Sequence, residues 1–276
     1  CRSRNTRQKG AISMKLGFIG CGNMAKAIIG GILRHGIASP NEVTASAPHA
    51  ETREKAAKEF GINTTPSNCE VAKADIVFLA VKPQFYETVI REIRDVITPT
   101  QLIVSIAPGK SIQTITDWFG KPVKLIRTMP NTLAMVGEGV TALCPADTVT
   151  QDELNQVIRL FEACGTAEVM PERLIDGVVA VSGSSPAYIF MIIEAMADGA
   201  VRDGIPRAQA YRLAAQSVLG SAKMVLETGR HPGELKDMVC SPAGTTIEAV
   251  AAMERCGLRS AILEGMEACS RKTRGM

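Results

Sequence analysis

The sequence has few aromatic residues and no long apolar run. Aromatic side chains make up only 4% of the 276 residues although 46% are hydrophobic, so the core must be built from Ala, Val, Ile, Leu and Met. No apolar run reaches the roughly 18 residues that a membrane span needs. The segment before Met14 is basic and polar and lacks the apolar core of a secretory signal. We therefore expect no membrane partner, and we interpret residues 1–13 as a disordered leader or an expression scar.

The sequence also lacks the spacings of a metal site and carries little net charge. Its three histidines and eight cysteines show no metal-ligand spacing, and no two cysteines form a C-x-x-C pair. A chain that can bury a core does not need a disulfide framework, so free thiols in a reducing compartment are expected, which favours the cytoplasm. The formal charge of +3 includes several basic residues close to the N-terminus, so no nucleic-acid partner is expected.

The first part of the chain alternates between short apolar runs and helical patterns. Strands are predicted for KLGFIG, EVTAS, ADIVFLAV, QLIVSIA and VKLIRTMP. ADIVFLAV has almost no polar residue, which is typical of a parallel sheet covered on both faces. Strand–helix alternation of this kind predicts an α/β domain with a doubly wound parallel sheet over residues 14–171.

The second part, residues 172–276, has long helical patterns and no strand pattern. Pro186 and Pro206 lie where a first helical turn should begin, a position that proline tolerates. Several of these helices are apolar around most of their circumference, and a domain of about a hundred residues cannot bury so much apolar surface within itself. We therefore predict an all-helical dimerisation domain whose apolar surface is covered by a second chain.

A glycine-rich turn follows the first predicted strand. The segment GFIGCGNMAKA places Gly20, Gly22 and Ala25 in the pattern G-x-G-x-x-A, between a strand and a helix. Gly20 permits a tight turn, Gly22 lets a pyrophosphate approach the helix N-terminus, and Ala25 lets helix and strand pack closely. The pattern alone is weak evidence, but in this context it predicts a Rossmann-type dinucleotide-binding domain.

The second predicted strand bears on the choice of dinucleotide. Proteins that bind NAD usually carry an acidic residue at its end, whereas this strand ends at Ser46 and the next acid is Glu51. A carboxylate at this position would repel the extra phosphate of NADP, whereas a hydroxyl can lie beside it. The sequence therefore favours NADP, with NADPH preferred over NADH. His49 and Arg53 could add positive charge, although a solvated helix face explains Arg53 equally well.

Two further segments are predicted to lie at the same edge of the sheet, where ligands of open sheets bind. AVKPQ follows a central strand, and its Lys82 is either a phosphate contact or a surface lysine. TMPN ends a later strand. No metal ligand is predicted, and the predicted cofactor-binding residues are Gly20, Gly22, Asn23, Met24, Ala25, Ser46, Asn68, Val81, Lys82, Pro83, Met129, Pro130 and Asn131.

Together with later segments, these motifs resemble one family. GFIGCGNMAKAI, AVKPQ, RTMPN, VSGSSPAY, EAMADGAV, AAQSVLGSAKMV and HPGELKDMVCSPAGTTIEAV are similar to pyrroline-5-carboxylate reductase, over essentially all of residues 14–276. The last of these segments is the most specific. The resemblance implies NAD(P)H-dependent reduction of 1-pyrroline-5-carboxylate to L-proline, the last step of proline biosynthesis. It also implies a homodimer with interlocked C-terminal helices, and it allows a pentamer of dimers.

By the same resemblance, the loop CSPAGTTIE receives the substrate. Thr246 is the predicted catalytic residue, because its hydroxyl would contact the ring nitrogen or the carboxylate. Helix capping is the alternative role for Thr245 and Thr246, and Ala243 stands where glycine is frequent in this loop. The predicted substrate-binding residues are Val239, Ser241, Gly244, Thr245, Thr246, Ser182 and Ser184. The two serines could instead cap the helix that begins near Pro186.

Reduction of a cyclic imine requires little acid–base catalysis by the protein. The iminium can take its proton from solvent before it binds, so the protein must mainly hold the substrate and orient it. Beta-hydroxyacid dehydrogenases, the nearest alternative, need proton transfer and carry a lysine on the first helix of the second domain. Here that helix has none, and Lys223 lies on the next one. A non-catalytic NADP-binding scaffold is the second alternative, although no motif is degraded.

Overall fold

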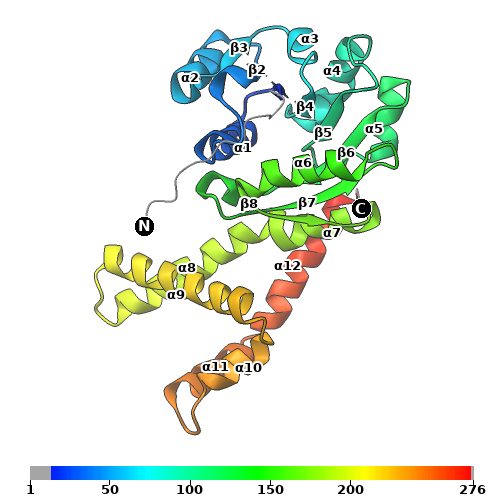
Figure 1. Ribbon diagram of the computed structural model, residues 1–276. Coiled ribbons are helices and arrows are strands. Elements are labelled where there is room, and N and C mark those ends of the chain that lie inside the picture. The colour runs from blue at the N-terminus through cyan, green and yellow to red at the C-terminus, as the bar shows by residue number, and fades with distance from the viewer. Residues whose placement is uncertain (1–13, 275–276) are drawn as a thin grey trace. The chain divides into compact units, whose positions relative to one another are not determined.

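The computed structural model describes residues 14–274, and the predicted leader 1–13 lies outside this range. Two compact units divide the chain between Gly183 and Ser184. The elements of both are labelled in Figure 1.

The first unit is built on one eight-stranded sheet with the order β3-β2-β1-β4-β5-β6-β7-β8. All neighbours are parallel except β6 and β7. The chain runs outward from β1 in both directions, so the carboxyl ends of β1 and β4 form the switch point at which such sheets bind ligands. The strands are β1 Leu16–Ile19, β2 Val43–Ser46, β3 Asn63–Thr65, β4 Ile76–Leu79, β5 Leu102–Ser105, β6 Lys124–Met129, β7 Gly139–Pro145 and β8 Gly165–Val169.

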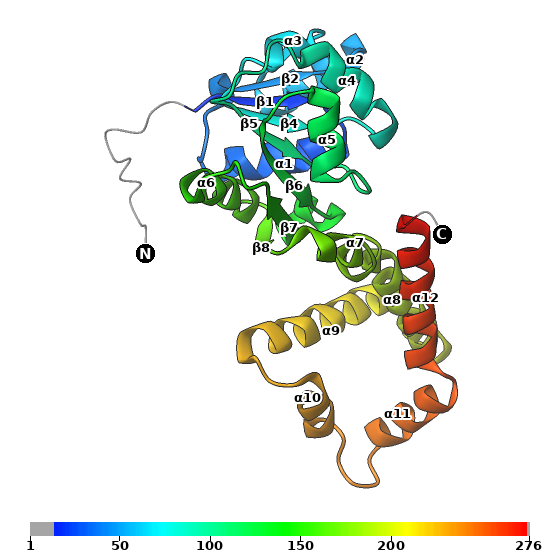
Figure 2. The same cartoon turned by 90° about the vertical axis from the view of Figure 1, so that its right-hand side faces the viewer.

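Helices cover both faces of this sheet, as Figure 2 shows. They are α1 Asn23–Arg34, α2 Ala50–Phe60, α3 Asn68–Val71, α4 Tyr86–Ile93, α5 Ile112–Phe119 and α6 Gln151–Glu162. Alternate strand residues point to opposite faces: Phe18 packs in a core with α1, α2 and α6, and Ile19 packs in a second core with α3, α4 and α5. The predicted doubly wound sheet is therefore confirmed.

The sequence patterns missed three strands, namely β3, β7 and β8. The segment between β6 and β7 is a single short turn, η3 Thr132–Val136, closed by Gly137 at φ 81°. A parallel neighbour needs a crossover of a dozen or more residues, so a connection this short returns the chain antiparallel. β8 then pairs parallel to β7 after α6.

A helical segment closes the first unit and is held by an almost buried arginine. It comprises η4 Glu172–Leu174, α7 Ile175–Val178 and the π-helical turn η5 Val179–Gly183. Arg127 on β6 has a side chain only 7% exposed, and its guanidinium pairs with Glu172 at 3.0 Å and with Asp176 at 2.7 Å. Two carboxylates on one buried cation fix the start of this helical segment against the sheet.

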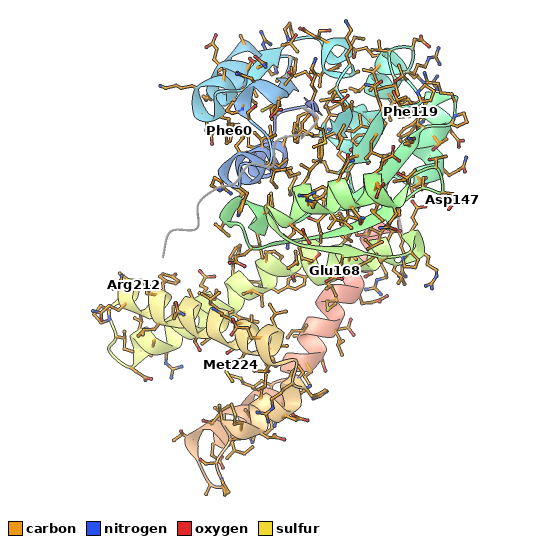
Figure 3. All side chains as sticks on the ribbon, in the orientation of Figure 1. Phe60, Phe119, Asp147, Glu168, Arg212 and Met224 are labelled. Carbon is orange, nitrogen blue, oxygen red and sulfur yellow. The ribbon has the colours of Figure 1, made fainter. Side chains whose placement is uncertain are left out.

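The second unit consists of helices alone, namely α8 Ser185–Arg202, α9 Arg207–Thr228, α10 Pro232–Met238, α11 Thr245–Arg255 and α12 Leu258–Thr273. Its buried residues are Pro186, Ala197, Ala210 and Ala214. Large apolar side chains stay exposed in the single chain, such as Met191 at 69% and Leu226 at 83%. Figure 3 labels another, Met224 on α9. Four small buried residues make no core, so this unit needs a partner surface.

One helical stretch of residues 14–274 is long and apolar enough, by length and composition, to cross a membrane. It is Glu172–Arg202, with a mean hydropathy of 1.5 and 17% of its most apolar window buried. No uninterrupted apolar run reaches this length, because residues 182–186 separate two apolar segments, but the helical stretch as a whole does. An exposed apolar helix of this kind also suits a surface that dimerises.

Candidate active site

The turn after β1 leaves the N-terminus of α1 open to a ligand. Gly20 has φ 99°, and a Cβ there would lie 2.7 Å from the carbonyl oxygen of Ala80, so only glycine fits. Gly22 is the exposed N-cap of α1, with no capping side chain, and a Cβ there would meet nothing within 4 Å. Ala25 is buried in the core behind the turn. Unsatisfied N–H groups at a helix start, with open space before them, suit a pyrophosphate.

The end of β2 carries a short hydrogen-bond chain. Ser46 is 1% exposed, and its hydroxyl donates to Oδ1 of Asn68 at 2.7 Å. Asn68 in turn donates to the carboxylate of Glu92 at 2.8 Å. Both predicted cofactor residues thus have internal partners, and the Ser46 hydroxyl can donate to a phosphate only after it turns away from Asn68.

A cation lies where NAD-binding proteins place an acid. Nη1 of Arg53 donates to the carbonyl oxygens of Ala47 at 2.7 Å and Pro48 at 2.9 Å, directly after β2. Among residues 14–274, Arg53 forms no ion pair, whereas Glu51 is paired with Lys55 at 2.7 Å. Backbone carbonyls hold this guanidinium at the end of β2, and the sequence left its role open.

The third and fourth predicted cofactor segments follow β4 and β6. Lys82 is exposed and begins the turn η2 Pro83–Phe85, and it forms no ion pair within residues 14–274. At the end of β6, Pro130 and Asn131 are buried. Asn131 Nδ2 donates to the Ser182 carbonyl at 3.0 Å, and its Oδ1 accepts from the Val140 N–H at 3.2 Å. Both ends of the Asn131 amide are therefore used inside the protein.

The predicted substrate residues divide between the two units. Ser182 belongs to the first unit, is 6% exposed, and donates its hydroxyl to the Val178 carbonyl at 3.1 Å. The other six belong to the second unit. Ser184 lies 3.2 Å from the Cys269 sulfur. The remaining five, Val239, Ser241, Gly244, Thr245 and Thr246, lie in or beside the loop between α10 and α11.

This loop presents an uncapped helix start. Gly244 is the N-cap of α11, without a side-chain cap, and Thr245 and Thr246 are exposed in the first turn. Neither hydroxyl has a hydrogen-bond partner among the described residues, so the capping alternative is not realised in the single chain. Ala243 has φ 55°, the left-handed region that favours glycine. That conformation explains why glycine suits this position.

The buried thiols do not supply a nucleophile. Burial raises the pKa of the Cys144 and Cys164 thiols to about 11, so both stay protonated near neutral pH. Within residues 14–274, no group of three or more His, Cys, Asp or Glu side chains could hold a metal ion.

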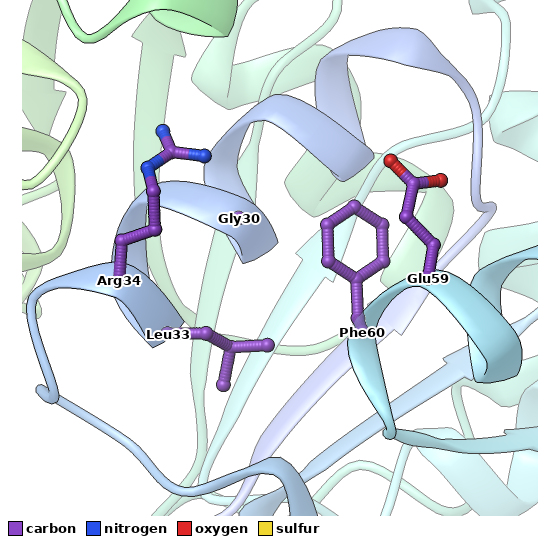
Figure 4. Close-up of a pocket in the computed structure, with 5 residues that line it drawn as sticks. All are labelled: Gly30, Leu33, Arg34, Glu59 and Phe60. Atoms are coloured by element: carbon purple, nitrogen blue, oxygen red, sulfur yellow. The ribbon is translucent and has the colours of Figure 1, made fainter.

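One cavity lies away from these sites. It has a volume of about 390 Å³ and is lined by Gly30, Leu33, Arg34, Glu59 and Phe60 (Figure 4). These residues are at the carboxyl-terminal ends of α1 and α2, whereas the glycine turn is at the start of α1. The cavity is therefore separate from the predicted dinucleotide site.

Comparisons with known proteins decide the family. The family model "Pyrroline-5-carboxylate reductase dimerisation" matches residues 172–276, and the model "NADP oxidoreductase coenzyme F420-dependent" matches residues 15–109. Over 260 residues, the chain is 51% identical to pyrroline-5-carboxylate reductase of Escherichia coli strain K12, covering 94% of this chain and 97% of that relative. The chain belongs to the pyrroline-5-carboxylate reductase family. It is an oxidoreductase with a Rossmann-type domain for a nicotinamide dinucleotide.

Solved structures of this reductase family share the whole fold. The Coxiella burnetii pyrroline-5-carboxylate reductase has a TM-score of 0.89 at 34% identity and covers 96% of this chain and 98% of its own. The Plasmodium falciparum pyrroline carboxylate reductase, solved with NADP bound, has a TM-score of 0.86 at 30% identity, covering 95% and 97%. The predicted sheet domain and helical dimerisation domain are thus confirmed.

Proposed function

We propose that this chain reduces 1-pyrroline-5-carboxylate to L-proline, with NADPH as the preferred hydride donor. The observation that carries the proposal is 51% identity, over 94% of the chain, to a pyrroline-5-carboxylate reductase. Two open helix starts support it: α1 on the first unit suits a pyrophosphate, and α11 on the second suits a carboxylate.

The protein's own groups bind and orient in this mechanism. The first-turn N–H groups of α11 hold the substrate carboxylate, and the free Thr246 hydroxyl faces the ring nitrogen. NADPH, when bound, supplies the hydride that reduces the imine carbon. The ring nitrogen arrives protonated from solvent, so no side chain has to deliver a proton, and rate enhancement comes from proximity and orientation.

The lysine expected for the alternative dehydrogenase chemistry is absent from the first helix of the second unit. Helix α8 carries no lysine or histidine, and Lys223 on α9 is exposed and pairs with Glu227 at 3.4 Å. Oxidation of an alcohol would need such a group within reach of the hydroxyl. Structures of more distant dehydrogenases, such as Aquifex aeolicus prephenate dehydrogenase at 16% identity and a TM-score of 0.55, share the fold alone.

The direct test is NADPH oxidation by the purified chain on addition of 1-pyrroline-5-carboxylate. We expect loss of NADPH absorbance with formation of an equal amount of proline. NADP reduction with a 3-hydroxy acid, and none of the expected reaction, would favour the dehydrogenase alternative. Binding of NADPH without any turnover would favour the scaffold.

We propose residues 14–171 and 172–276 as the two functional domains, and a homodimer with interlocked C-terminal helices as the assembly. The match of the dimerisation family model to residues 172–276 and the exposed apolar side chains of α8 and α9 support this. A pentamer of such dimers is a further proposal. The cytoplasm is proposed as its location, since seven cysteines of the described residues are free.

We expect Arg53→Gln to lower kcat/KM with NADPH by about tenfold and to leave kcat/KM with NADH nearly unchanged. A guanidinium on the extra phosphate contributes roughly 1.4 kcal/mol at an accessible site, which is about a factor of ten. Arg53 is a better target than Ser46, because Ser46→Asp would put a carboxylate into a site only 1% exposed.

The matched control is Lys55→Gln, which removes one positive charge from the exposed face of the same helix. The ratio of kcat/KM values for the two cofactors is the measurement. An unchanged ratio in Arg53→Gln, or an equal change in Lys55→Gln, would show that Arg53 only belongs to a solvated face.

A further inference from the structure

The π-helical turn Val179–Gly183 leaves one backbone carbonyl without its helical partner. In an α-helix the Ser182 carbonyl would accept from the N–H four residues later, but residue 186 is proline, which has no N–H. π-turns of this kind occur frequently at functional sites. Ser182 is buried, so its carbonyl needs another donor.

Asn131 supplies that donor. Its Nδ2 lies 3.0 Å from the Ser182 carbonyl oxygen, and its Oδ1 lies 3.2 Å from the Val140 nitrogen. The side chain is 3% exposed. The amide therefore bridges the start of β7 and the π-turn from a loop at the carboxyl edge of the sheet.

A second contact joins the π-turn to the end of β6. A Cβ added at Gly183 would lie 3.0 Å from the Met129 methyl group, so this turn packs closely on the last residue of β6. Arg127, farther back on β6, holds Glu172 and Asp176 at the other end of the helical segment. β6 and its following loop thus fix both ends of residues 172–183.

We propose that Asn131 is a positioning residue: it sets the π-turn, and with it Ser182, relative to the cofactor edge at Met129 and Pro130. This inference rests on the proposed function, which makes the carboxyl edge of the sheet the NADPH site. It differs from the cofactor contact expected from the sequence, because both functional ends of the Asn131 amide are bonded inside the protein. Loss of the Asn131 bridge should displace Ser182, a predicted substrate-binding residue, and leave dinucleotide binding unchanged.

The test is Asn131→Ala in the full-length protein, with kcat and KM for 1-pyrroline-5-carboxylate and the NADPH dissociation constant measured separately. We expect kcat to fall about tenfold and the NADPH constant to stay within about twofold. Asn155→Asp on the exposed surface of α6 is the control and should match the wild type. Equal losses in kcat and NADPH affinity would mean that Asn131 contacts the cofactor, and would overturn the proposal.

A second variant distinguishes two roles of Asn131: positioning the π-turn, or only providing a hydrogen-bond donor to the buried Ser182 carbonyl. Pro186→Ala restores an N–H that can serve the Ser182 carbonyl, so the double variant Asn131→Ala/Pro186→Ala should regain part of the lost thermal stability, while the Val140 N–H still lacks its acceptor. Its kcat should stay low, because the turn is still untied from the cofactor edge. Recovery of kcat together with stability would show a structural role only.

A measurement that needs no substrate tests this inference separately from the proposed function. NADPH should slow amide hydrogen exchange across residues 179–183 in the wild type and have a much smaller effect in Asn131→Ala. Absence of turnover in the wild type would defeat the proposed function and leave this coupling measurable. Equal protection in both proteins would overturn the positioning role.

Discussion

Two inactive variants are expected to regain about a quarter of wild-type activity when they are co-expressed. Gly22→Glu places a carboxylate where the pyrophosphate binds, and the open space around Gly22 lets the chain still fold. Thr246→Tyr fills the exposed start of α11 on the other unit. Each pure dimer then lacks one half of every site.

The restoration follows from a site shared between two chains. If the loop before α11 of one chain meets the cofactor edge of its partner, each mixed dimer has one doubly broken site and one intact site. Random mixing makes about half of the dimers mixed, so about a quarter of all sites work. The exposed apolar side chains of the second unit are the reason to expect such an interlocked pair. Activity per total chain of the unfractionated 1:1 mixture is the measurement, and two different tags serve only to check that about half of the dimers are mixed.

A reciprocal pairing checks the same geometry. When wild-type chains are co-expressed with the double variant Gly22→Glu/Thr246→Tyr, a shared site leaves both sites of a mixed dimer broken, and about a quarter of the activity remains. A site formed within one chain would instead leave about half. No recovery in the first pairing, with half of the activity in the second, would place each complete site in a single chain.

Thr246→Ala is expected to lower kcat/KM for 1-pyrroline-5-carboxylate by about one to two decades, with NADPH binding nearly unchanged. A hydrogen bond to a charged group contributes roughly 1.5–3 kcal/mol. In the single chain, the exposed Thr246 hydroxyl has no partner among residues 14–274, and the N-cap position belongs to Gly244. The hydroxyl is thus available to a ligand.

Thr150 offers the matched control, because it is a true helix cap. Its hydroxyl accepts from the Glu153 N–H at 3.3 Å, and Glu153 reaches back to the Thr150 N–H at 2.9 Å. Thr150→Ala should lose about 1 kcal/mol of stability and keep its activity. Thr246→Ala should do the reverse. Wild-type kinetics with reduced stability in Thr246→Ala would show that Thr246 only supports the helix.

Local patterns were sufficient for most of the sheet domain. β1, β4 and β5 are short apolar runs between helical patterns, and β2 and β6 mix apolar with polar residues that are mostly buried, so period and composition predict them. β3 and β8 carry polar residues on exposed or half-buried positions, and no such pattern marks them. β7 follows a turn too short for a crossover, which the patterns did not show.

The sequence by itself determined the glycine turn, because the requirement for φ 99° at Gly20 and for an open Gly22 is local to one strand–turn–helix unit. It also determined that the helical half has too much apolar surface for one chain. Only the tertiary structure decided where the polar side chains of the site are directed. Ser46 bonds to Asn68, 22 positions away, Arg53 folds back onto the end of β2, and Asn131 bonds to Ser182, 51 positions away. Hydrogen-bond partners so distant along the chain are chosen by the packing of strands and helices, and no local pattern of residues records them.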